Sequence, residues 1–188
     1  MRPIAPGVPR AAQPNTWIRR IFARRMLDIQ VSERVNVVVN RDLECLICAK
    51  HRGRGSLVGP VVHADEFVVV THRVLGAGAG VVPGYLFVEP RRHVGNLAHL
   101  TWEEAQALAR AVWCGARALD AELAPRHVFS MIAGRSVAHV HQHLFVRPRS
   151  MPEEFAWHDV DSWTGGERLD AEGLALLCSK LSRWFGES

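Results

Sequence analysis

The chain has 188 residues, of which 48% are hydrophobic and 22% charged, and its formal net charge is +4. Four cysteines are too few for a disulfide scaffold, and no stretch reaches the roughly eighteen apolar residues of a membrane span. We therefore expect one soluble, cytoplasmic globular domain with no membrane partner.

The first 30 residues differ from the rest of the chain. They contain four prolines, lack steady periodicity and carry six arginines before the first acidic residue, Asp28. Such a basic segment is more often a solvated extension than a nucleic-acid or lipid contact. We predict a poorly ordered basic arm over residues 1–30, a single domain over 31–188, and no specific nucleic-acid binding.

Runs rich in β-branched and apolar residues predict the strands that follow. The candidate strands are Val35 to Val39, Leu57 to His63, Phe67 to Thr71, Tyr85 to Val88, Val128 to Ala133 and His139 to Val146. Asp65-Glu66 is a short polar connection between the second and third candidates, which predicts a hairpin of adjacent antiparallel strands.

Two helices complete the expected pattern. Thr101 followed by Glu104 is a capping box, and apolar residues recur behind it at helical spacing to about Leu123. Asp170 is the expected cap of a second helix that runs to about Phe185. Strands interrupted by one long helix and closed by another predict an α+β fold with the helices gathered to one side of the sheet.

Three histidines, His139, His141 and His143, lie two residues apart in the last candidate strand. In a strand this spacing directs all three side chains to one face. Imidazole acts as nucleophile, general acid or metal ligand near neutral pH, so the three together can attack a phosphorus centre. A surface histidine cluster and an incidental metal site are the alternative interpretations.

The run from His139 to Phe145 resembles the motif His-φ-His-φ-His-φ-φ of the histidine triad (HIT) family, in which φ is apolar. Gln142 departs from the motif and needs a hydrogen-bond partner or a partly wet face. Gly134-Arg135-Ser136-Val137 is similar to the family's Gly-Gln-Ser-Val, and Val82 to His93 to its Pro-Gly-His-x-Leu-Val-x-Pro-Lys-x-His, with Tyr85 in place of the histidine. The resemblance covers about residues 45–147. It implies an antiparallel sheet of about five to six strands with one long helix and a C-terminal helix.

The resemblance also implies a function and residue roles. His141 would be the nucleophile that forms a covalent nucleotidyl-histidine, and His143 would bind phosphate or protonate the leaving group. Ser136, Gly134, Arg135 and Val137 would hold the phosphate oxygens. The chain is thus expected to be a hydrolase that acts on phosphorus-containing bonds of nucleotides or nucleotide conjugates, such as phosphoramidates or dinucleoside polyphosphates. A nucleotidyltransferase or phosphorylase, and a nucleotide-binding module with little turnover, are the alternatives.

Cys45 and Cys48 have the spacing of half a zinc site, although a single Cys-x-x-Cys is also compatible with redox chemistry or packing. Family members that resemble this chain pair the motif with two histidines, which here are His93 and His139. Two cysteines and two histidines form a closed tetrahedron, as in structural zinc sites. His51 is a rival ligand, and Cys114 and Cys178 are expected to be packing residues inside the helices.

Two further expectations concern the surface. Family members commonly pair through the long helix and a sheet edge, and the small residues Ala105, Ala109, Ala116 and Ala121 favour a symmetric homodimer. The same small residues also suit packing of the helix on its own sheet. Trp157 and Trp163 either stack on a base or leaving group or pack against the sheet.

Overall fold

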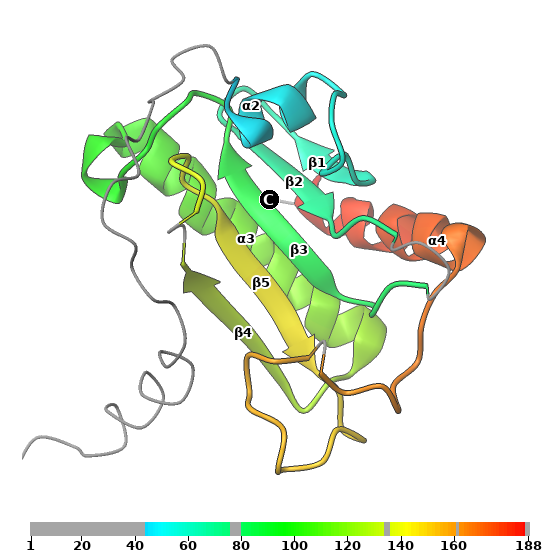
Figure 1. The fold of residues 1–188 in the computed structure, drawn as a ribbon. Coiled ribbons are helices and arrows are strands. Elements are labelled where there is room, and N and C mark those ends of the chain that lie inside the picture. Colours follow the sequence, from blue (N-terminus) through cyan, green and yellow to red (C-terminus); the bar gives the residue numbers. More distant parts are fainter. Residues whose placement is uncertain (1–43, 76–79, 134–135, 161, 187–188) are drawn as a thin grey trace, which may run out of the picture. The chain divides into compact units, whose positions relative to one another are not determined.

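The computed structural model describes residues 44–75, 80–133, 136–160 and 162–186. Figure 1 shows a sheet with α3 and α4 on one face and a short helix, α2, at one end. The predicted N-terminal arm and the candidate strand Val35 to Val39 lie outside the described residues. Within the described part of the chain, the α+β architecture predicted from the sequence is confirmed.

Five antiparallel strands form the sheet, in the order β1-β2-β3-β5-β4. Their bounds are β1 Val61–Ala64, β2 Val68–His72, β3 Tyr85–Pro90, β4 His127–Ile132 and β5 Gln142–Arg147. The predicted β1–β2 hairpin is present, because the Asp65 carboxylate accepts hydrogen bonds from the backbone N–H groups of Phe67 and Val68. This local turn chemistry aligns β1 with β2.

The helices begin where the sequence provides caps. Their bounds are α2 Leu46–His51, α3 Trp102–Leu123 and α4 Ala171–Ser182, with 3₁₀ turns at Leu97–His99 and Arg183–Phe185. Both hydrogen bonds of the Thr101–Glu104 capping box are formed at the start of α3. The Asp170 side chain caps α4 by accepting from the N–H of Gly173.

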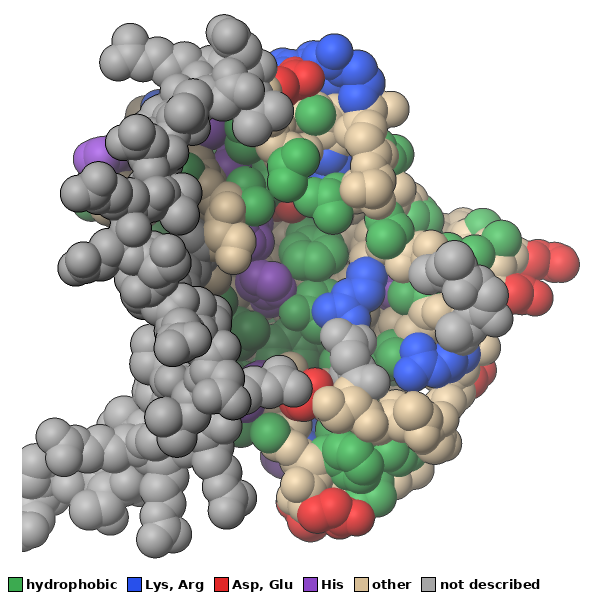
Figure 2. All heavy atoms as spheres, in the orientation of Figure 1, with side chains coloured by type: hydrophobic (Ala, Val, Ile, Leu, Met, Phe, Trp, Pro, Cys, Tyr) green, Lys and Arg blue, Asp and Glu red, His purple; other side chains and the backbone are tan. Residues whose placement is uncertain are grey.

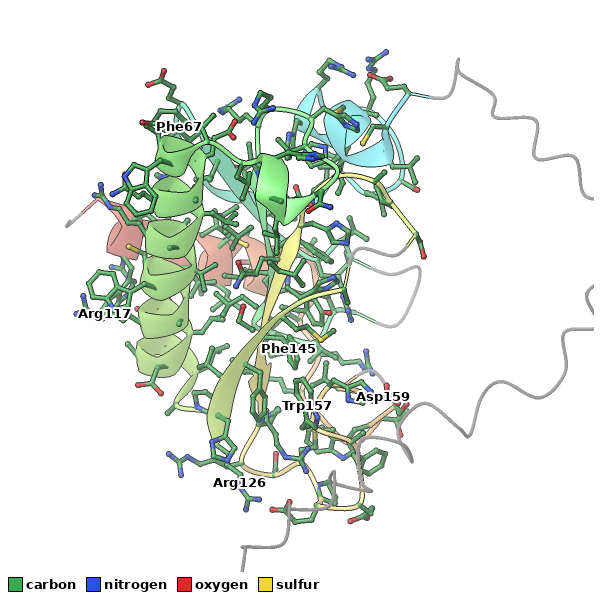
Figure 3. All side chains as sticks on the ribbon, turned by 90° about the vertical axis from the view of Figure 1, so that its left-hand side faces the viewer. Phe67, Arg117, Arg126, Phe145, Trp157 and Asp159 are labelled. Atoms are coloured by element: carbon green, nitrogen blue, oxygen red, sulfur yellow. The ribbon has the colours of Figure 1, made fainter. Side chains whose placement is uncertain are left out.

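The two faces of the sheet have different roles. One face carries Leu86, Val88 and Leu144 into the main core, which α3 and α4 close with side chains such as Leu119 and Leu181. The opposite face carries Tyr85, Phe87, His143 and Phe145. The segment after β5 covers part of this second face, and in Figure 3 Trp157 lies beside Phe145 on the side of the sheet away from α3.

The prediction of a strand from His139 to Val146 is wrong at its start, because the strand begins at Gln142. The N–H of His139 donates to Val137 O in a tight turn, and that of Val140 donates to Val94 O, which lies outside the ladder between β3 and β5. Only His143 of the three histidines therefore lies in the strand. The candidate strand Leu57 to His63 is likewise shortened at its start to Val61.

None of the helices in the described part of the chain combines the length and the apolar character that a membrane-spanning segment requires.

Candidate active site and metal centre

The three histidines of the motif lie close together, although only one belongs to β5. His139 is fully buried, whereas His141 and His143 are partly exposed. The ring centroids of His141 and His143 are 5.1 Å apart. Figure 2 shows histidine side chains near the centre of the open face of the sheet, among hydrophobic side chains. A ligand can reach this pair of rings without passing through the main core.

His141 has its tautomer set by the backbone. Its Nδ1 atom lies 2.7 Å from the carbonyl oxygen of His139. A carbonyl oxygen only accepts, so Nδ1 of His141 carries the hydrogen and the neutral ring has its lone pair on Nε2. That nitrogen is the one that can act as a nucleophile.

His143 lies directly beside Tyr85 on β3. The Tyr85 hydroxyl oxygen is 2.9 Å from Nδ1 of His143. Burial, the neighbouring His141 and the positive charge of Arg73 lower the pKa of His143 to about 4. His143 is therefore neutral near pH 7, with one ring nitrogen as acceptor and the other as donor.

The predicted zinc ligands form a cluster. One ligand atom from each of Cys45, Cys48, His93 and His139 lies within 4.8 Å of the other three. Nδ1 of His139 is 3.5 Å from both sulfur atoms, and Nδ1 of His93 is 3.5 Å from the sulfur of Cys48. A tetrahedron with Zn–S of about 2.3 Å and Zn–N of about 2.0 Å has an S···N edge of about 3.5 Å. The four residues can therefore hold a zinc ion.

The surroundings of the cluster also suit a cation. Nε2 of His139 donates to Pro90 O at 2.8 Å, which leaves Nδ1 free to be a ligand, as is usual for metal-binding histidines. Burial and the nearby Cys45 thiol raise the pKa of Cys48 to about 11. A bound cation would counter this effect by stabilising the thiolate form.

Helix α2, which the sequence did not predict, places both cysteines. Cys45 is its N-cap residue and Cys48 lies one turn later, so the two thiols share one side of the helix. The rival ligand His51 is not part of the cluster. Its Nε2 atom instead bonds Glu89 at 2.9 Å.

Sequence reasoning also missed the buried group formed by Lys50, His51 and Glu89. Nζ of Lys50 lies 2.8 Å from one carboxylate oxygen of Glu89, and all three side chains are less than a tenth exposed. Burial alone would raise the pKa of Glu89, but the hydrogen bond from His51 and the charge of Lys50 lower it. A glutamate in an otherwise apolar strand was the one sequence signal for this group.

The residues expected to bind phosphate are described only in part. Ser136 is exposed, and with Val137 it lines a groove of about 550 Å³ that also borders Cys45, Cys48 and His93. Gly134 and Arg135 lie outside the described residues. Gln142 has the hydrogen-bond partner that its place requires, because its amide nitrogen donates to the hydroxyl oxygen of Ser130 at 2.8 Å.

The remaining cysteines and aromatic residues have packing roles. Cys114 and Cys178 are buried in the main core, as predicted. Trp163 packs against the aromatic cluster of the open face. Trp157 packs on Phe145 and Phe129 and remains 42% exposed, so it packs against the sheet while keeping one part of its ring accessible.

No family model and no curated protein matches the sequence. Solved structures do match the fold. A HIT-like protein of Bartonella henselae, described as involved in cell-cycle regulation, is 17% identical with a TM-score of 0.55, over 75% of this chain and 96% of that one. A zinc-bound histidine triad family protein of Mycobacterium smegmatis is 19% identical, also with a TM-score of 0.55, over 77% of this chain and 98% of that one.

A hypothetical histidine triad nucleotide-binding protein of Sulfolobus tokodaii gives a similar result, with 17% identity and a TM-score of 0.54 over 76% of this chain and 92% of that one. Each of the three neighbours is covered over nearly its whole length. The described part of this chain therefore has the histidine triad fold, with a cluster of two cysteines and two histidines that can hold zinc.

Proposed function

We propose that this chain is a histidine triad family hydrolase that cleaves the phosphorus-containing bond of a nucleotide or nucleotide conjugate through a covalent nucleotidyl-His141. The proposal joins two independent supports. The sequence has the His-φ-His-φ-His-φ-φ motif with one polar exception, and the fold is that of histidine triad proteins. Nucleotide binding is part of this proposal, and the histidine triad nucleotide-binding protein of Sulfolobus tokodaii among the structural neighbours supports it.

The observation that carries the proposal is the hydrogen bond from Nδ1 of His141 to His139 O. It leaves the lone pair of Nε2 on a partly exposed ring that lies next to His143. In the first step, Nε2 of His141 forms a bond to phosphorus while the bond from phosphorus to the leaving group breaks. In the second step, water attacks the same phosphorus and releases a nucleoside monophosphate and the free imidazole.

The phosphate oxygens need donors while these steps proceed. We assign this role to Ser136, to the backbone N–H groups around Gly134 and Val137, and to the side chain of Arg135, with His143 on the side of the leaving group. Positive charge and N–H donors stabilise the negative charge that develops on the oxygens.

Zinc held by Cys45, Cys48, His93 and His139 would have a structural role, because four protein ligands leave no open position for substrate. When bound, it supplies a fixed point for the turn that carries His139. His139 in turn presents its carbonyl oxygen to His141. The metal ligands thus position the nucleophile through the backbone and take no direct part in the reaction.

The test is to trap the intermediate. A slowly hydrolysed substrate with a ³²P label at the transferred phosphorus should label His141, and the label should be stable in base and lost in acid, as expected for phosphohistidine. His141→Ala should abolish labelling and turnover with the fold intact. His99→Ala is the matched control, because His99 is exposed and lies far along the chain from the motif.

Other outcomes would separate the alternatives. Label at a different residue would reject the role of His141. Release of a nucleoside diphosphate when inorganic phosphate is added would indicate phosphorolysis or transfer in place of hydrolysis. Tight nucleotide binding without turnover, unchanged in His141→Ala, would indicate a binding module.

A further inference from the structure

Tyr85 is the closest polar neighbour of His143 in the described structure, and the steps above give it no role. Its hydroxyl lies 2.9 Å from Nδ1 of His143, from the adjacent strand β3. In the register of the sheet, Tyr85 lies opposite Phe145 and His143 lies opposite Phe87. The contact is thus a diagonal one across two paired strands, on the open face.

The packing around Tyr85 fixes the direction of its hydroxyl. The side chain is only 5% exposed, and its ring stacks on Phe145 with 5.3 Å between centroids and an angle of 17°. The guanidinium carbon of Arg73 lies 3.6 Å from the centroid of the same ring. A ring held between a cation and an aromatic neighbour has little freedom to turn away from His143.

The charged groups that face His143 come from several elements. The charged or titratable groups near His143 are Arg73, which follows β2, His141, which precedes β5, and the buried pair Lys50 and Glu89. Met131, which is paired with His143 on β4, is uncharged. The Arg73 cation over the ring favours the phenolate form of Tyr85 and so makes its hydroxyl a better donor. A neutral His143 that accepts this hydrogen bond at Nδ1 carries its own hydrogen on Nε2.

A neutral imidazole gives up its Nε2 hydrogen readily only if Nδ1 gains one at the same time. We propose that Tyr85 supplies that proton, so that His143 relays a proton from Tyr85 to the leaving group. This proposal rests on the proposed function. It adds a source for the second ring proton, which a neutral His143 does not carry.

The transfers balance. As the bond from Nε2 of His141 to phosphorus forms and the bond to the leaving group breaks, the Nε2 hydrogen of His143 moves to the leaving atom. The hydroxyl proton of Tyr85 moves to Nδ1 of His143. The resulting phenolate lies against the Arg73 guanidinium. When water attacks the intermediate, its proton enters at Nε2 of His143 and the Nδ1 proton returns to Tyr85.

The relay matters for one class of substrate. Leaving groups that are strong bases when they depart, such as alkyl amines and alkoxides, need a proton in the transition state. Leaving groups that are stable anions, such as p-nitrophenolate, do not. Tyr85 therefore acts as a positioning and proton-supplying residue through His143, and it extends the enzyme's range to the first class.

The kinetic test compares two synthetic substrates, a nucleoside phosphoramidate with an alkyl amine and the p-nitrophenyl ester of the same nucleotide. Tyr85→Phe keeps the ring and its stacking. In a single turnover, where release of the leaving group reports the first step alone, we expect it to slow release from the phosphoramidate by about a hundredfold and release from the p-nitrophenyl ester by no more than about a factor of two. Met131→Leu is the matched control, because it changes the residue paired with His143 on β4 and removes no side-chain hydrogen bond. Equal losses of Tyr85→Phe on both substrates would overturn the relay.

A second measurement needs no turnover. Nitrogen-15 NMR of labelled histidine distinguishes the two tautomers of His143 in the free protein. We expect the Nε2–H form in the natural chain and a mixture in Tyr85→Phe, and an Nδ1–H form in the natural chain would overturn the proposal. Because this measurement uses no substrate, failure of the relay is distinguishable from failure of the proposed hydrolase activity.

Discussion

The backbone carbonyl of His139 accepts a hydrogen bond from Nδ1 of His141 at 2.7 Å, while Nδ1 of His139 faces the sulfur atoms of the metal cluster. One residue thus serves the metal site with its side chain and the nucleophile with its main chain. Any change that shifts His139 in the cluster also shifts the acceptor that sets the tautomer of His141.

The first prediction follows from this link. His93→Ala removes an exposed ligand that has no part in the reaction. We expect it to lower zinc content, to lower stability by about 4 kcal/mol if free zinc is a thousandfold above the Kd of the intact site, and to slow labelling of His141. Metal analysis, chemical unfolding and single-turnover labelling measure the three effects. His99→Ala, an exposed histidine of the same loop, should change none of them.

Zinc content should also depend on pH. We predict one zinc per chain in protein purified without added metal, and its loss on acidification together with a fall in stability. Thiols must lose their proton to bind zinc, and burial raises the pKa of the Cys48 thiol to about 11. Protons therefore compete with the metal increasingly as the pH falls. Zinc released on a rise in pH from neutral, or absent from the purified protein, would contradict this assignment.

Local signals in the sequence predicted the elements that depend on local chemistry. The Thr101–Glu104 capping box and the Asp65 turn each join residues that are at most three positions apart in sequence, and both are formed as predicted. The start of β5 was misplaced because Val140 bonds Val94, more than forty residues earlier. A period of two residues indicates a strand but does not show which segment the backbone pairs with.

The candidate site shows the same division. The resemblance to histidine triad proteins predicted the four residues of the metal cluster, because their types and order are part of a motif. Contacts that belong to this chain alone could not be predicted. Lys50 and Glu89 are 39 residues apart in sequence, and Tyr85 and His143 are 58 apart. Such contacts depend on tertiary packing that no pattern in a single sequence records.

The buried pair of Lys50 and Glu89 leads to a stability prediction. Glu89→Leu leaves Lys50 buried without its partner, so we expect a loss of about 3–5 kcal/mol in the free energy of unfolding. The double variant Lys50→Met with Glu89→Leu also removes the unpaired Lys50 charge and should recover part of that loss, while the buried His51 still lacks its Glu89 partner. Urea unfolding of the two variants and the natural chain measures the difference, and equal losses in both variants would show that the charge pair is not the cause.

The same pair contributes a pH dependence. The hydrogen bond from His51 and the charge of Lys50 outweigh burial and hold the pKa of Glu89 below its usual value in the folded state. A carboxyl group with a lowered pKa stabilises the fold above its unfolded pKa, and that stability is lost as the pH falls through the folded value. The double variant should therefore lose less stability than the natural chain between neutral and acid pH, in unfolding measured with the metal removed from both.

Gly84 immediately precedes Tyr85 and has a φ of +80°. A Cβ atom there would lie 2.6 Å from Cδ1 of Leu123. We expect Gly84→Ala to lower stability by about 2–4 kcal/mol, through backbone strain and overpacking together. Gly53→Ala is the matched control, since Gly53 has a φ of +71° but no atom within 4 Å of the added Cβ. A similar loss in both variants, measured by chemical unfolding, would assign the whole effect to strain.

The last prediction concerns the exposed side of α3, which faces away from the sheet. Trp102 and Trp113 are 72% and 53% exposed, and the exposed Ala109 lies between them. Two large aromatic residues that flank a small one form a face on which a second helix can pack closely. We therefore expect a symmetric homodimer through α3. Light scattering at micromolar concentration should give twice the monomer mass of 21.0 kDa, and Ala109→Arg should return it to the monomer. Ala171→Arg, the same substitution at an exposed position of α4, should leave the dimer intact, and a natural chain of monomer mass would reject this interface.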